Sequence, residues 1–171
     1  IRHYRRVLAL DRKHPKTHNN LAVALQSQGD MEQAVVHFRT QVELSPSNPR
    51  ARYNLATALA SESDNEEAVL HLTKALAIDS QLKPARYALA DSLRIQNSFD
   101  QAHRLYTELL REDPEDATAH YGKARVHLAQ DQNLVARESF RHAISLDAEL
   151  MNPLNNLAWE LATHPDNGAR N

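Results

Sequence analysis

The sequence predicts an all-α chain made of tandem copies of one helical hairpin. Alanine recurs every 34 residues in two ladders that lie twelve positions apart, and only a repeated supersecondary unit produces such registers. The ladders are Ala22, Ala56, Ala90, Ala124 and Ala158, and Ala34, Ala68, Ala102 and Ala136. The composition also favours helix, because the 171 residues include only 3 glycines and no long β-branched or aromatic run. We therefore expect an α-solenoid of antiparallel helix-turn-helix repeats.

Residues 1–14 fit the second half of a preceding, truncated unit. The segment from Ile1 to Leu10 is already amphipathic and begins without a capping residue. Its apolar side chains would normally lie against the first helix of that unit. We expect this open face to favour self-association or to be covered by flanking chain. The apolar residues concerned are Ile1, Val7, Leu8 and Leu10.

Four complete units follow. Counting Pro15 as position 1, they span residues 15–48, 49–82, 83–116 and 117–150. In the first unit, Leu21 and Leu25 predict the buried stripe of one helix, and Phe38 and Val42 predict that of a second. A polar break separates the two helices, and Pro46 ends the second because its ring fixes φ. The alanine ladders mark the points where the two helices of a unit approach closely.

The fourth unit departs from this pattern. Lys123 and His127 occupy positions 7 and 11, where the other units carry leucine. A lysine can lay its stem along apolar surface and keep its ammonium in water, and Asp131 is one helical turn beyond His127 as a partner. Because buried charge is costly without a partner, two interpretations stay open, a locally weakened repeat and a polar pocket with a function.

The repeated unit resembles the tetratricopeptide repeat, and the resemblance covers nearly the whole chain. That family has a small residue at position 8, alanine at 20, an aromatic or large apolar residue at 24, a small residue at 27 and proline at 32. Position 24 here holds Phe38, Leu72, Tyr106 and Phe140. Position 27 departs from the family at Gln41 and Leu109. The resemblance implies a right-handed superhelix of helical hairpins whose concave face binds proteins.

The resemblance also implies which residues form that concave face, namely positions 2, 5, 6, 9, 12 and 13 of the first helices. Position 5 supplies three tyrosines in register, Tyr53, Tyr87 and Tyr121. Tyrosine offers broad contact and a hydroxyl, and asparagine both donates and accepts hydrogen bonds, which suits an extended peptide. Since these residue types are also the commonest there in the family, a ligand ladder and a generic repeat face both stay open. The predicted partner-binding residues are Asn19, Asn20, Arg50, Tyr53, Asn54, Tyr87, Asp91, Tyr121, Arg125, Asn155 and Trp159.

Residues 151–171 predict a partial fifth unit, with a first helix and a loop. The segment from Leu154 to Asp166, followed by Arg170 and Asn171, resembles the NNLAW-LATxPD segment that closes repeat arrays in large bacterial multidomain proteins. This resemblance implies a bacterial origin and a missing remainder of the chain. It motivates a second hypothesis, that the array is a targeting or regulatory segment of a larger bacterial enzyme or redox protein.

Several classes of site are not expected. The chain has no cysteine, which excludes disulfides and thiolate metal sites within these residues. Its 10 histidines include a single i, i+4 pair, His14 and His18, and Pro15 lies between them at a predicted helix start, so they are not expected to form a metal site. There is no glycine-rich phosphate loop. The longest apolar run, Leu21 to Leu25, is far below the roughly 20 residues of a membrane span. We expect no cofactor, no metal and no enzyme activity in a soluble chain whose compartment, cytoplasm or periplasm, stays unknown.

The leading hypothesis is a non-catalytic protein-protein interaction scaffold that binds an extended peptide or a helix of a partner on its concave face. Residues 1–50 hold eight Lys and Arg against four Asp and Glu, although the whole chain has a formal net charge of −2. That polarity would steer an acidic partner to the N-terminal half. The lack of a basic stripe argues against nucleic acid. A third hypothesis is a self-assembly module that stacks through its open repeat ends.

The C-terminal carboxylate clamp of chaperone-binding repeats is a specific variant that this sequence does not match. That clamp needs lysine at position 5 and asparagine at position 9 of one repeat. The first unit has Asn19 and Val23 there, and the second has Tyr53 and Thr57. A partner is therefore expected to bind by other contacts.

Overall fold

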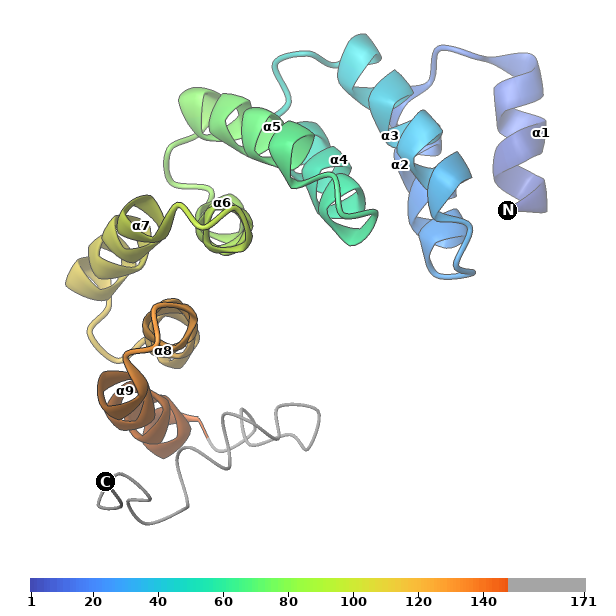
Figure 1. Cartoon of the computed structure of the whole chain (residues 1–171). Helices are drawn as coiled ribbons and strands as arrows, with labels where there is room; N and C mark the ends of the chain where they lie inside the picture. The colour runs from blue at the N-terminus through green and yellow to red at the C-terminus, as the bar shows by residue number, and fades with distance from the viewer. Residues whose placement is uncertain (148–171) are drawn as a thin grey trace. The chain divides into compact units, whose positions relative to one another are not determined.

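The computed structural model describes residues 1–147, which form nine α-helices joined by short turns and contain no strand (Figure 1). The predicted all-α fold of helix-turn-helix repeats is confirmed. The chain divides into two compact units, Ile1–Ser92 and Leu93–Asn171. No helix of the described part is long and apolar enough to cross a membrane. The helices are α1 (Arg2–Leu10), α2 (Pro15–Gln26), α3 (Met31–Leu44), α4 (Pro49–Ser61), α5 (Asn65–Ile78), α6 (Lys83–Ile95), α7 (Phe99–Glu112), α8 (Ala117–Ala129) and α9 (Asn133–Leu146).

Most helices begin where the sequence provides a side-chain cap. Asn48 caps α4, because its Oδ1 accepts hydrogen bonds from the backbone N–H groups of Arg50 and Ala51 at 3.0 and 3.2 Å. Pro49 takes the first helical position, where an N–H would have no partner within the helix. The other side-chain caps are His14 for α2, Asp30 for α3, Asp64 for α5 and Asp116 for α8.

Each turn between the two helices of a hairpin contains one residue in the left-handed region. Gly29 has a φ of 81°, and Ser63, Asn97 and Asp131 have φ values of 67°, 59° and 59°. Glycine adopts this conformation freely and asparagine and aspartate tolerate it, whereas serine carries a steric cost. These four residues are 34 positions apart, so the turn repeats in the backbone even where the side chain differs.

The alanine ladders lie at the centre of the hairpins. In the first compact unit, α2 lies beside α3 and α4 beside α5 (Figure 1). Ala22, Ala34, Ala56 and Ala68 are completely buried there, as the close approach of the helices requires. Large apolar side chains fill the space beside these contacts. They include Leu21, Leu25, Phe38, Leu55, Leu59 and Leu72.

The second compact unit has a core of the same kind. α8 packs on α9 around Ala124, Ala136 and Phe140. The ring of Tyr106, on α7, is buried beside Gly122, where an added Cβ would lie 2.3 Å from ring atoms. Only glycine therefore fits this position of α8 without a shift of the ring. Ala158, the last residue of the first ladder, lies outside the described residues.

The N-terminal helix α1 packs against α2 but has no fully buried residue. Val7 is 40% exposed and Leu10 is 92% exposed, so an apolar face is open there, as expected from the sequence. Self-association through this face stays a prediction. The repeat boundaries also stay predictions, and the partial unit at 151–171, with its closing segment, lies outside the described residues.

Candidate functional site

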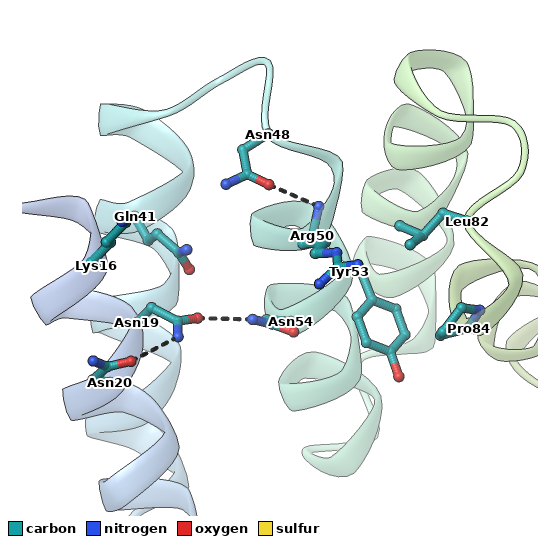
Figure 2. Close-up of a pocket in the computed structure, with 10 residues that line it drawn as sticks. All are labelled: Lys16, Asn19, Asn20, Gln41, Asn48, Arg50, Tyr53, Asn54, Leu82 and Pro84. Carbon is teal, nitrogen blue, oxygen red and sulfur yellow. Dashed lines mark hydrogen bonds between the residues drawn. The ribbon is translucent and has the colours of Figure 1, made fainter.

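A groove of about 580 Å³ opens in the first compact unit, between α2 and α4 (Figure 2). Its volume is within the range of about 300–1,000 Å³ that is typical of ligand sites. The lining residues are Lys16, Asn19, Asn20, Gln41, Asn48, Arg50, Tyr53, Asn54, Leu82 and Pro84.

The helical repeat explains why these side chains converge. Positions 2, 5 and 6 of a first helix are three and four residues apart, so they share one side of that helix. The 34-residue period places the same three positions of α2 and α4 next to each other along the groove. Five of the residues predicted to bind a partner line it, and their role stays a prediction. They are Asn19, Asn20, Arg50, Tyr53 and Asn54.

A chain of carboxamide hydrogen bonds crosses the groove from α4 to α2 (Figure 2). The Nδ2 of Asn54 donates to the Oδ1 of Asn19 at 2.8 Å, and the Nδ2 of Asn19 donates to the Oδ1 of Asn20 at 3.2 Å. Because Asn19 and Asn54 are both half-buried, this contact fixes the two side chains across neighbouring repeats.

The groove carries positive charge. Lys16 and Arg50 are both exposed, and none of the lining residues within the described range is a carboxylate. Tyr53, Leu82 and Pro84 add apolar surface beside these charges. A ligand that combines an acidic group with hydrogen-bonding main chain would match this lining.

Gln41, on α3, lies at the floor of the groove and was not among the predicted site residues. Only 7% of its surface is exposed, and its Oε1 has no hydrogen-bond partner among residues 1–147. The equivalent position 27 holds Ala75, Leu109 and Ala143, which are completely buried apolar residues. The sequence did contain a signal, since Gln41 departs from the small residue of the repeat pattern, but the departure alone gave it no role.

Two residues of α6 that were predicted to bind a partner, Tyr87 and Asp91, do not line the groove. Tyr87 is half-buried, and the Nζ of Lys83 lies 5.9 Å from the centroid of its ring. Asp91 is half-buried on the same helix. The predicted binding roles of Tyr87 and Asp91 stay predictions.

In the second compact unit the position-5 tyrosine takes part in packing. Tyr121 contacts the core cluster, and its ring meets that of Phe140 edge-on with the centroids 5.4 Å apart. The guanidinium of Arg125 lies 6.0 Å from the centroid of the Tyr121 ring. Asn155 and Trp159 lie outside the described residues.

The polar pair of the fourth repeat is half-buried, and one predicted contact is wrong. His127 does not pair with Asp131. Its Nδ1 is hydrogen-bonded to the Oε1 of Gln132 at 2.7 Å. The reason is local, because α8 ends before Asp131, which adopts a left-handed conformation in the turn. The bond to Gln132 lowers the cost of placing His127 at this half-buried position.

Two histidines meet across the first hairpin. The Nδ1 atoms of His18 and His37 are 3.0 Å apart, and the Nε2 of His18 lies 2.9 Å from the carbonyl oxygen of Arg12. Because a carbonyl only accepts, the Nε2 of His18 carries a proton, and in the neutral ring its Nδ1 accepts from the Nδ1–H of His37. Burial, the nearby His18 and the charge of Arg5 lower the pKa of His37.

Two further histidine pairs occur in the second compact unit. The ring centroids of His103 and His127 are 5.4 Å apart, and those of His120 and His142 are 4.4 Å apart. Sequence reasoning missed all three pairs because the partners belong to different helices. Within residues 1–147, no three potential ligands gather into a metal site.

Comparison with known proteins gives a family and a fold. The family model described as tetratricopeptide repeat matches residues 20–82 and 87–161. The crystal structure of MamA is similar, with a TM-score of 0.76, 20% identity and 88% of each chain covered. MamA from Desulfovibrio magneticus gives a TM-score of 0.70 at 21% identity, covering 86% of this chain and 89% of that chain.

YrrB, described as a TPR protein with an unusual peptide-binding site, gives a TM-score of 0.58 at 18% identity and covers 90% of this chain and 97% of its own. No curated protein sequence matches the chain. At these identities the similarity to solved structures shows the fold alone.

Proposed function

This chain belongs to the tetratricopeptide repeat family, and we propose on that premise that it binds an extended, acidic segment of a partner protein in the groove between α2 and α4. The family and the repeat proteins of similar fold support the general role of a protein-interaction scaffold. The finer proposal, which assigns the groove, rests on the hydrogen bond between Asn54 and Asn19.

That hydrogen bond fixes the carboxamides of Asn54 and Asn19. One polar atom at each end of the chain of carboxamide bonds stays available to a ligand. Within residues 1–147, the Oδ1 of Asn54 and the Nδ2 of Asn20 have no hydrogen-bond partner. An extended peptide carries an N–H and a C=O at each residue that need partners. The groove therefore offers one acceptor and one donor to the main chain of a bound peptide.

The charges of the groove define the chemistry of the segment. Lys16 and Arg50 are exposed and would attract the carboxylates of a ligand, because no described lining residue is acidic and could neutralise them. Such exposed pairs raise the association rate more than the affinity, and salt screens them. Binding through this groove should therefore weaken as the salt concentration rises.

A random linear peptide library, selected against the immobilised full chain, tests the proposal. We expect enriched peptides to be acidic and to bind with an affinity that falls about two- to tenfold in Asn54→Ala, the range for one hydrogen bond. Asn133→Ala is the matched control, because Asn133 is an exposed asparagine at the start of α9. Isothermal titration calorimetry measures the affinities.

Two results would overturn the proposal. One is a library selection that enriches no peptide. The other is a set of enriched peptides that bind the Asn54→Ala and wild-type chains equally well, since they would then occupy another surface.

A further inference from the structure

Gln41 is a buried polar residue that lines the groove. Only 7% of the residue is exposed, and its carboxamide oxygen has no hydrogen-bond partner in the described part of the chain. Figure 2 shows the carboxamide pointing away from α3 into the space between α2 and α4. A buried polar group that lacks a hydrogen bond is destabilising, so this arrangement needs an explanation.

The fold itself does not need a polar side chain at this position. The equivalent residues of the other repeats are alanine or leucine, and Ala75, Leu109 and Ala143 are all completely buried. The first repeat therefore holds a glutamine where its own architecture accepts an apolar side chain. A residue that lowers stability and faces a groove is typical of a site shaped for binding.

The surroundings of Gln41 limit what can satisfy it. Asn19 and Asn54, which line the same groove, already bond to each other, and none of the described residues is hydrogen-bonded to the Gln41 carboxamide. The missing partner must come from outside residues 1–147, from solvent or from a ligand. A peptide group carries one donor and one acceptor in a fixed plane, which matches the donor and acceptor of a carboxamide.

We propose that Gln41 is a ligand-binding residue, whose carboxamide pairs with one main-chain peptide group of the acidic segment that the groove holds. This inference rests on the proposed function and adds a specific subsite to it. Lys16 and Arg50 bind the carboxylates of the segment, and Gln41 fixes the register of its main chain. The glutamine thus exchanges stability of the free chain for selectivity in the complex.

The two effects have opposite signs, and this makes the proposal testable. Gln41→Ala introduces the residue that the next repeat has at this position, Ala75. We expect its melting temperature to equal or exceed that of the wild-type chain, whereas its affinity for the library-selected peptides falls at least about threefold. Gln101→Ala, an exposed glutamine on α7, is the matched control and should change neither quantity.

A backbone substitution locates the contact. In the selected peptide, each amide is replaced in turn by an ester, which removes one N–H donor and weakens the neighbouring acceptor. We expect one ester position to weaken binding to the wild-type chain but not to Gln41→Ala, because the two changes remove the same contact. Gln41→Leu, which matches Leu109 and is closer in volume, repeats the measurement without opening a cavity.

The outcomes separate the two proposals. If no ester position is coupled to Gln41 while Asn54→Ala still weakens binding, the role of Gln41 is wrong and the groove proposal stands. If Gln41→Ala loses both stability and affinity, and Gln41→Leu does the same, Gln41 is a structural residue. If no peptide is selected, both proposals fall.

Discussion

The hairpins α2–α3 and α8–α9 share a backbone conformation but differ in the large side chains that pack between their helices. In the first hairpin Leu21 and Leu25 are 1% and 2% exposed, whereas Lys123 and His127 stand half-buried at the same positions of the second. The alanine contacts are equally buried in both. The alanine contacts and the turn are therefore enough to define the hairpin. The residues at positions 7 and 11 change its stability and the polarity of its interior.

The largest expected effect is a difference in stability between two alanine variants. The two substituted tyrosines both occupy position 5 of their repeats. Tyr121 packs on the core of α8 and α9, whereas Tyr53 lines the groove. Tyr121→Ala should therefore lower the free energy of unfolding by about 2–3 kcal/mol, and Tyr53→Ala by less than about 1 kcal/mol. Urea denaturation gives both values. Equal losses would mean that the two tyrosines play the same structural part.

A second change tests the fit between Tyr106 and Gly122. Gly122→Ala should cost about 1–3 kcal/mol through overpacking, because its Cβ would meet the Tyr106 ring. Adding Tyr106→Leu should relieve the clash, since leucine and alanine already occupy the equivalent positions at Leu72 and Ala88. Thermal unfolding of the single and double variants checks the coupling. A double variant no more stable than Gly122→Ala would exclude the ring as the cause.

Restoring leucine to the fourth repeat should make the second hairpin more like the first. Lys123→Leu combined with His127→Leu should raise the free energy of unfolding by about 1–2 kcal/mol, as apolar burial increases. In the wild-type chain, amide exchange should be faster across residues 122–130 than across residues 54–62. Equal protection, or a loss of stability on substitution, would favour the polar pocket over the weakened repeat.

The smallest expected effect is a common response of both compact units to acid. Burial is the first cause that lowers the pKa of His37 in one unit and of His103 in the other. A histidine with a folded pKa below its unfolded value of about 6.5 contributes stability above that pH and loses it as the pH falls towards the folded pKa. The unfolding free energy should thus be lower at about pH 5.5 than at about pH 7.5. His37→Asn should reduce this slope, and a flat profile in the wild-type chain would contradict the assignment.

The sequence predicted the repeat and the helix pairs because these depend on local and periodic signals, and the alanine ladders needed no knowledge of contacts. The positions expected to face a partner came from the resemblance to the repeat family, and their binding role stays a prediction. Other features depend on pairs of residues from different helices, as in His18 with His37, or on the exact end of a helix, as in His127 with Gln132. Gln41 shows best what sequence reasoning cannot reach. Its identity departs from the repeat pattern, but only its burial and its unpaired carboxamide oxygen in the described structure mark it as a candidate ligand-binding residue.

The left-handed turn residues have a consequence for how such a chain can change in evolution. Gly29, Ser63, Asn97 and Asp131 reverse the chain at the same point of each hairpin, so deleting one of them would remove the conformation that returns the second helix to the first. Substitution at this point is tolerated, as four different residues show. A change in length at this turn therefore disturbs the hairpin, whereas duplication of a complete repeat preserves it.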